Sequence, residues 1–398
     1  MKKIDVVFPA YINASIGPTG TLRRLMANRD YLLSRGYELN VFTLDSISSS
    51  TLPSESPKPI DFSKGLGLRS KIKDICKSSR LLTVILLRIL AYKECQFIKS
   101  YLKKNRNPEV VVFHSAMPCY YYLKHRISNS KVVLFHHSNG LAADMIVKSY
   151  PTLKGGVFLK KFVRKYKFAN NNVDQNVFIS YEGYNNFKME NNVSNIDTMT
   201  VFHNGIDEMP ILDVAKVTDK KYNLCTTGTV CERKGQYLIL EAMSRLDVSK
   251  RKDFHLSIYG NGPDLANLQQ YAKEHGLEDS VSFYGYVPNK EIHEKLSANN
   301  IYVLMSNNEG LPISIIEAMR AGLGIISTRI SGILEQVDER NGVLIDPNSE
   351  QLYEILNNMD QLDWESLGVA SRRRFDEEFT FKQMISSYCD MLDKVTKN

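Results

Sequence analysis

Short apolar runs, rich in valine and isoleucine, recur along the chain with longer amphipathic stretches between them. The first half carries five of these runs, over 4–10, 38–44, 109–115, 131–137 and 175–180. The second half carries six, over 222–228, 254–260, 280–285, 301–306, 323–329 and 342–346. Runs of this kind alternating with helical stretches are typical of parallel sheets built from βαβ units. The pattern therefore predicts an α/β protein with two doubly wound domains.

Three helices can be placed from local signals. Residues 20–34 are expected to form the first helix, ending at Gly36, because glycine readily takes the left-handed conformation that closes a helix. Another is expected over 312–321, since it would begin with a proline, which suits the first helical position. The last segment, about 379–398, is also expected to be helical, whereas 46–59 is a Ser/Pro-rich loop.

Length and composition narrow the class of protein. A chain of 398 residues predicts about two domains. Its apolar runs fall short of the ~18–20 residues that a membrane-spanning helix needs. Six scattered cysteines without a CxxC pair indicate a reduced, cytoplasmic protein and argue against structural zinc.

Charge is distributed unequally between the two halves. Residues 1–205 hold 30 Lys and Arg against 14 Asp and Glu, and the remainder holds 21 against 30. Within the first half, 64–106 carries twelve bases and two acids among leucines, isoleucines and tyrosines. This segment is either a pair of surface helices on their own sheet or an interfacial segment on an anionic membrane. Nucleic acid is not expected as a partner, because no recognised binding module is present and the second half is acidic.

Candidate chemistry is densest in SNNEGLPISIIEAMRAGLGIIS, residues 306–327. A helix beginning at Pro312, directly after a strand and a short loop, offers free amides and a positive dipole end to a phosphate. Glu309 lies just before this helix and Glu317 within it. One carboxylate could then bind a sugar and the other a ribose, as acidic residues do in dinucleotide-binding domains. An ordinary βα unit with surface acids is the alternative.

The spacing of Glu309 and Glu317 is the E-x7-E pattern, and the region resembles retaining glycosyltransferases of the GT-B fold, notably family 4 (glycosyl transferases group 1). Further matches follow in the family's order: VFHNGID, GTVCERKG, YGNGPDLANLQQYA, VSFYGYVPNKEI and NGVLIDP. The resemblance covers essentially the whole second half. It implies two Rossmann-like domains facing across a cleft. Residues 1–205 would bind the acceptor, with the last helix crossing back onto them, and 206–378 would bind a nucleotide-sugar.

The resemblance also implies roles for individual residues. Lys234, together with Arg233, would neutralise the donor diphosphate, and Glu309 would hold sugar hydroxyls near the anomeric carbon. The remaining donor-binding residues would be the loop after Glu309, the ribose-binding glutamate and the two residues flanking the base: Gly310, Leu311, Pro312, Ile313, Glu317, Val287 and Pro288. Where the family often has arginine, this chain has Thr229, which leaves the role of Arg233 open.

In the first half, FPAYINASIGPTGTLRRL resembles the family's opening strand, glycine loop and helix. Gly20 would let the backbone approach the donor phosphate. The family carries a histidine near the transferred sugar at the end of the strand that KVVLFHH matches. His136 is the first candidate and His137 the second, with packing as the alternative for each. The expected catalytic set is therefore Glu309, Lys234 and His136.

The expected activity is transfer of a hexose from a nucleotide-sugar, with UDP as the expected nucleotide, to a saccharide acceptor with retention of configuration. No metal or other cofactor is expected. The charge of the first half and the habit of the family favour a lipid-linked acceptor in bacterial surface polysaccharide, capsule or lipopolysaccharide assembly, at the inner face of the membrane. The alternatives are a nucleotide-sugar epimerase and a non-catalytic partner of another transferase.

Overall fold

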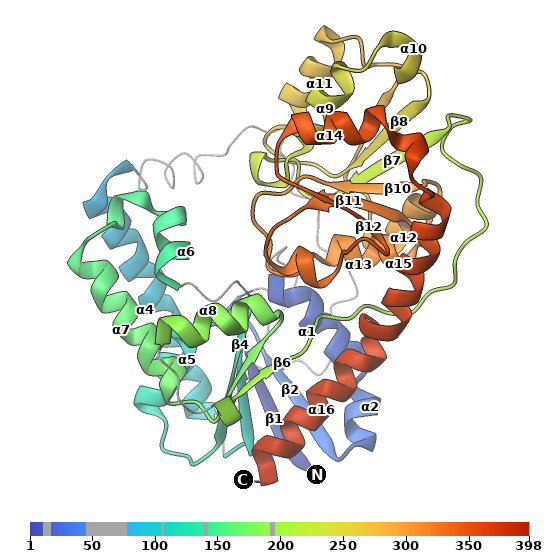
Figure 1. Ribbon diagram of the computed structural model, residues 1–398. Helices are drawn as coiled ribbons and strands as arrows, with labels where there is room; N and C mark the ends of the chain where they lie inside the picture. The colour runs from blue at the N-terminus through green and yellow to red at the C-terminus, as the bar shows by residue number, and fades with distance from the viewer. Residues whose placement is uncertain (11–16, 45–77, 105–106, 138–141, 192–195, 398) are drawn as a thin grey trace. The chain divides into compact units, whose positions relative to one another are not determined.

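The computed structural model describes residues 1–10, 17–44, 78–104, 107–137, 142–191 and 196–397 (Figure 1). The chain divides into two units, one formed by Met1–Phe202 with Ile385–Asn398 and the other by His203–Met384. The loop expected over 46–59 and the beginning of the basic segment, 64–77, lie outside the described residues.

The first unit is built on a parallel six-stranded sheet with the order β2-β1-β3-β4-β5-β6. Its strands are β1 (Lys2–Val7), β2 (Tyr37–Phe42), β3 (Val110–Phe113), β4 (Lys131–His136), β5 (Gln175–Phe178) and β6 (Met199–Val201). The five predicted strands are present. The sequence did not predict β6, because three residues at a sheet edge are too few to show an alternating pattern.

Helices cover both faces of this sheet: α1 (Gly17–Ala27), α2 (Arg29–Ser34), α4 (Arg80–Lys104), α5 (Ala116–His125), α6 (Ala142–Ser149), α7 (Val157–Asn171), α8 (Tyr181–Asn191) and α16 (Phe381–Lys397). Neighbouring strand residues point to opposite faces. Leu134 accordingly lies in the apolar core shared with α4, α5 and α7, which sit together in Figure 1. The next residue, Phe135, stacks on Tyr388 of α16, with ring centroids 5.9 Å apart.

The helix predicted over 20–34 is two helices in the structure. It begins earlier, at Gly17, and is interrupted at Asn28, whose φ of −111° and ψ of 33° are not helical. The Asn28 side chain donates to the Arg24 carbonyl at 3.0 Å. Asparagine side chains compete in this way with the helical hydrogen bonds, so the prediction of one continuous helix was wrong. Gly36 does follow α2 with a left-handed φ of 86°.

The second unit has its own parallel six-stranded sheet, ordered β12-β11-β10-β7-β8-β9. Its strands are β7 (Tyr222–Thr227), β8 (Phe254–Tyr259), β9 (Val281–Gly285), β10 (Ile301–Leu304), β11 (Gly324–Thr328) and β12 (Gly342–Ile345). All six correspond to predicted runs. Counted from the first strand of the unit, the order is 3-2-1-4-5-6, that of dinucleotide-binding domains.

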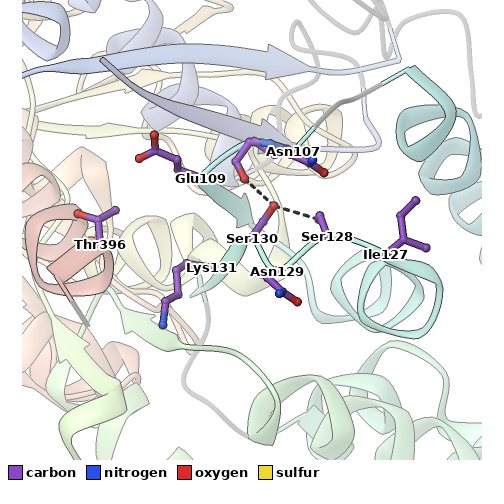
Figure 2. Close-up of a pocket in the computed structure, with 9 residues that line it drawn as sticks. Asn107, Glu109, Ile127, Ser128, Asn129, Ser130, Lys131 and Thr396 are labelled. Atoms are coloured by element: carbon purple, nitrogen blue, oxygen red, sulfur yellow. Dashed lines mark hydrogen bonds between the residues drawn. The ribbon is translucent and has the colours of Figure 1, made fainter.

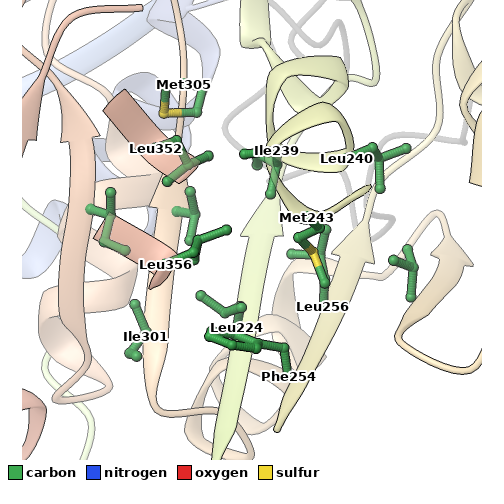
Figure 3. Close-up of a cluster of buried hydrophobic side chains, with 14 of the residues drawn as sticks. Leu224, Ile239, Leu240, Met243, Phe254, Leu256, Ile301, Met305, Leu352 and Leu356 are labelled. Atoms are coloured by element: carbon green, nitrogen blue, oxygen red, sulfur yellow. The ribbon is translucent and has the colours of Figure 1, made fainter. Parts of the chain in front are cut away.

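The helices of this unit are α9 (Gln236–Ser244), α10 (Val248–Arg251), α11 (Leu265–Glu274), α12 (Asn289–Ser297), α13 (Ile313–Arg320), α14 (Ser349–Asn357) and α15 (Trp364–Glu378). The α13 bounds agree with the predicted helix over 312–321. Figure 3 shows aliphatic side chains of β7, β8 and β10 packed beneath α9 and α14. The strands read as continuous apolar runs because both faces of the sheet are buried.

The strand order marks where a ligand is expected. Open parallel sheets bind ligands beyond the carboxyl ends of their strands, at the point where the strand order reverses. In the second unit this point lies between β7 and β10, and in the first unit between β1 and β3. In the described ranges, no helix combines the length and apolar character needed to cross a membrane.

Candidate functional site

Two loops leave the carboxyl ends of β7 and β10, at the reversal point of the second sheet. The first contains a short 3₁₀ helix, η4 (Glu232–Lys234), and the second leads into α13. Backbone contacts tie the loops together. The Asn307 N–H donates to the Arg233 carbonyl at 3.0 Å, and Ser306 Oγ lies 2.8 Å from the same oxygen. The Arg233 guanidinium also donates to the Asn308 carbonyl, so residues 75 positions apart form one surface.

Three donors converge on one carboxylate oxygen, Glu309 Oε1. Lys234 Nζ lies 2.8 Å from it, Arg233 Nη1 2.6 Å and Ser306 Oγ 2.8 Å. The Glu309 and Lys234 side chains are each 11% exposed, whereas Arg233 is 43% exposed. The structure thus brings together the glutamate, lysine and arginine singled out from the sequence.

The electrostatics of this cluster favour an ionised glutamate. Burial raises the pKa of Glu309, but the charge and hydrogen bond of Lys234, followed by Arg233 and Ser306, bring it below its ordinary value. The other oxygen, Oε2, has no hydrogen-bond partner within the described part of the chain. An ionised carboxylate accepts only, so Oε2 can take hydroxyl donors from a ligand.

The turn that presents Lys234 requires glycine at the next position. Gly235 has a left-handed φ of 69°, and a Cβ there would lie 2.0 Å from the Met305 carbonyl oxygen. The close approach of these two loops depends on the missing side chain.

The sequence prediction missed Ser306, which links the two loops. It is fully buried, and its carbonyl accepts from Thr328 Oγ1 at 2.6 Å at the end of β11. Its one signal in the sequence was a serine at the end of the apolar run 301–306.

A second support holds the loop before α13. The fully buried Gln336 donates from Nε2 to the Pro312 carbonyl at 3.1 Å. Gly332 packs against the same loop, since a Cβ there would lie 1.6 Å from the Gly310 oxygen. The backbone from Gly310 to Ile313 is therefore held in place by residues outside the E-x7-E pattern.

The remaining donor-binding candidates of this unit lie at the same edge of the sheet. Glu317 is half-buried in α13, five residues beyond Pro312 and so about 7–8 Å along the helix axis. Val287 and Pro288 are half-buried in the turn between β9 and α12. In the described residues, no group of three or more His, Cys, Asp or Glu side chains is arranged to hold a metal ion.

Comparison with known proteins relates most of the second unit to a described protein family. Residues 211–366, which include the Glu309 cluster, match the family model described as glycosyl transferases group 1. Residues 211–366 are therefore similar to a group 1 glycosyltransferase domain. The chain is 30% identical over 171 residues to WcaL of Escherichia coli K12, named as a colanic acid biosynthesis glycosyltransferase. That alignment covers 41% of this chain and 42% of WcaL, so the chain spans less than half of this relative's length.

Solved structures extend the likeness to both units. Sucrose-phosphate synthase of Thermosynechococcus elongatus aligns with a TM-score of 0.70 and 18% identity, covering 99% of this chain and 100% of that one. HepE of Anabaena, solved in complex with UDP, aligns with a TM-score of 0.67 and 15% identity, covering 99% and 100%. At these identities the likeness establishes the fold, which is GT-B.

The two candidate histidines, His136 and His137, point to opposite faces of the first sheet. His136 is buried: its ring stacks on Phe178 at 4.6 Å, and Nε2 lies 2.9 Å from Asn176 Oδ1. Burial lowers the pKa of His136 to about 4. His137 is partly exposed, with Nε2 2.7 Å from His114 Nδ1. The surroundings of His136 are those of a packed side chain, and its catalytic role stays a prediction.

Gly20 lies in the first turn of α1, because this helix begins three residues earlier than expected. Gly20 is the fourth residue of α1, and the residues directly before this helix lie outside the described ranges. Approach of a donor to Gly20 also stays a prediction.

A polar cavity of about 550 Å³ lies at the opposite edge of the first sheet, where β3 and β4 begin. Figure 2 shows Ser130 between Ser128 and the backbone preceding β3, with Lys131 and Glu109 nearby. Ligands of open parallel sheets bind at the carboxyl ends of strands, so this cavity is not the candidate site.

Proposed function

We propose that this chain is a glycosyltransferase that moves a hexose from a UDP-sugar to a saccharide acceptor, with retention of configuration and without a metal ion. The observation that carries the proposal is the cluster of Glu309, Lys234 and Arg233 at the reversal point of the group 1 domain. The UDP complex of HepE, a protein of the same fold, supports UDP as the nucleotide.

In this proposal the donor diphosphate lies between η4 and the beginning of α13. Lys234 and Arg233 would then exchange part of their contact with Glu309 for contact with phosphate oxygens. The amides of the loop that enters α13 add donors and a helix dipole. When the sugar leaves, the diphosphate gains negative charge, which these groups stabilise. Glu317 would bind the ribose, and Val287 and Pro288 would flank the base.

Glu309 would position the sugar. Its Oε2 can accept sugar hydroxyls while Oε1 keeps its cationic partners. Transfer passes through a state in which the anomeric carbon becomes positive, and a nearby ionised carboxylate favours that charge. No protein nucleophile is assigned: the acceptor attacks from the side of the leaving phosphate, which takes the acceptor's proton.

The proposed acceptor is a lipid-linked saccharide of bacterial surface polysaccharide, capsule or lipopolysaccharide assembly. Two observations support this choice. WcaL of Escherichia coli is named as a colanic acid biosynthesis glycosyltransferase, and residues 1–205 carry a large excess of bases. A basic surface favours anionic membranes and phosphate-bearing lipids. The proposed location is accordingly the inner face of the membrane.

The test is release of nucleotide from a panel of UDP-, GDP- and ADP-sugars, with and without EDTA. One UDP-sugar should be consumed, and EDTA should not change the rate. Glu317→Ala should raise KM for this donor by about tenfold or more, because it removes hydrogen bonds to a charged group. Glu354→Ala, at an exposed position of α14, is the matched control and should behave as the native chain.

Two outcomes would contradict the proposal. Conversion of a UDP-sugar into its isomer without nucleotide release would indicate an epimerase. Failure to bind or consume any nucleotide-sugar would indicate a non-catalytic partner of another transferase.

A further inference from the structure

A cavity of about 610 Å³ opens among α4, α5 and α7 of the first unit. Its volume is in the range of small-molecule sites, roughly 300–1,000 Å³. Most of its walls are apolar, with contributions from Leu87, Leu90, Ala91, Met117, Phe158 and Phe162. None of the residues assigned to the donor lines it.

Helix α4 also carries exposed apolar residues outside the cavity. Four of its residues lie along one side of the helix and are between 37 and 64% exposed: Leu82, Ile85, Ile89 and Tyr92. The C-terminal half of the helix is anchored, since Tyr101 donates to Asp5 Oδ2 at 2.7 Å. Tyr92 also lines the cavity, and an exposed apolar stripe of this length marks an interaction surface.

The charges that line the cavity are mainly positive. Arg88, Lys161 and Lys165 are among the lining residues, and Glu94 is the one carboxylate among them. Burial raises the pKa of Glu94 to about 7, so near neutrality this side chain is only partly charged. Apolar walls with three cations fit an amphiphile that carries a phosphate.

The cavity also reaches the ligand-binding edge of the sheet. Ser115 lines it and directly follows His114 at the carboxyl end of β3. This strand borders the reversal point of the first sheet. A molecule with its chain in the cavity would therefore place its head group where open sheets bind ligands.

We propose that this cavity holds the hydrocarbon chain of the lipid-linked acceptor, with Lys161 and Lys165 at its phosphate. The inference rests on the proposed function and assigns the part of the chain that recognises the lipid. The position of Ser115 at the sheet edge favours one acceptor molecule over general contact with membrane phospholipid.

The test is titration of the full chain with geranylgeranyl phosphate below its micelle concentration. Ala91→Trp fills the cavity and should weaken binding by about tenfold or more. Ala370→Trp, at a half-buried helical position of the second unit, is the matched control and should bind as the native chain. The double variant Lys161→Ala/Lys165→Ala should lose affinity for geranylgeranyl phosphate but not for geranylgeraniol.

Three results would overturn the inference. One is unchanged binding in Ala91→Trp and in the lysine double variant. Another is full competition by inorganic phosphate, which would indicate a phosphate site alone. The third is equal competition by vesicles of phosphatidylcholine and phosphatidylglycerol, which would indicate contact with bulk lipid.

A measurement on the native chain covers the case in which Ala91→Trp does not fold. A diazirine-bearing geranylgeranyl phosphate should label peptides 87–95 or 158–165, and labelling elsewhere would overturn the inference. Thermal stabilisation by UDP is recorded in parallel. Binding of the lipid without thermal stabilisation by UDP would contradict the proposed function. Stabilisation by UDP without binding of the lipid would contradict only the lipid site.

Discussion

At the scale of single residues, the charge of Glu309 determines what the site can bind. Burial alone would favour the neutral acid, but two cations and a hydroxyl outweigh burial and keep the carboxylate ionised. Lys234 is equally buried and needs an anionic partner. A donor diphosphate would supply a second anion to the same lysine. Lys234 is thus already in position to bind an anion, and Glu309 is the carboxylate that balances its charge.

Substitution of His136 and of His137 should separate a packing role from a functional one. His136→Ala removes a ring packed on Phe178 and should lower the free energy of unfolding by about 2–5 kcal/mol in urea titrations. His137→Ala removes a partly exposed ring but leaves the buried His114 without its hydrogen-bond partner, so it should cost about 1–3 kcal/mol, while slowing sugar transfer. A stable but inactive His136→Ala would instead restore His136 as the catalytic residue.

At the scale of elements, the turn between η4 and α9 depends on Gly235. Gly235→Ala should destabilise the second unit by more than about 1–3 kcal/mol, because it combines a left-handed backbone with a contact on the Met305 carbonyl. Gly276→Ala is the matched control, with a φ of 61° but no atom within 4 Å of the added carbon. If chemical denaturation gives both variants the same loss in the free energy of unfolding, the close approach of the two loops contributes nothing to stability.

The attachment of α15 predicts a dependence on pH. Arg340 first, and Arg374 of α15 at 2.8 Å, lower the pKa of Asp338 to about 2. A depressed pKa stabilises the fold above the ordinary value of about 3.9, and this contribution disappears as pH falls toward 2. Asp338→Asn should therefore be less stable than the native chain at pH 5–7, with the difference vanishing toward pH 2.

Thermal unfolding across this pH range checks the prediction. Asp279→Asn, at an exposed position, is the control and should follow the native curve. A difference for Asp338→Asn that stays constant down to pH 2 would exclude the ion pair as its source.

At the scale of the whole molecule, the architecture was largely predictable from the apolar pattern. Eleven of the twelve strands in the described residues follow from valine- and isoleucine-rich runs, because strands buried on both faces leave that signature. The edge strand β6, with three residues, was too short to show such a run. The break at Asn28 escaped because its side-chain hydrogen bond competes locally with a good helical pattern.

The candidate site was only partly predictable. The E-x7-E spacing and the loop after β7 pointed to Glu309 and Lys234, but the order of the strands, which brings them together, is not written in any local pattern. The same limit applies to Ser306, whose contacts come from a distant loop. Nor could the sequence say which of two adjacent histidines faces the core, since that depends on which sheet face the helices cover.

Lys234 and Glu309 form the proposed site for the donor diphosphate. Calorimetric titration with UDP and with uridine, on the native chain and Lys234→Met, tests it most directly. Lys234→Met should weaken UDP binding by about ten- to a hundredfold and leave uridine binding unchanged, because a charge-assisted contact is worth about 1.5–3 kcal/mol. Lys273→Met on α11 is the control. UDP binding that is absent in the native chain, or unaffected in Lys234→Met, would contradict the account.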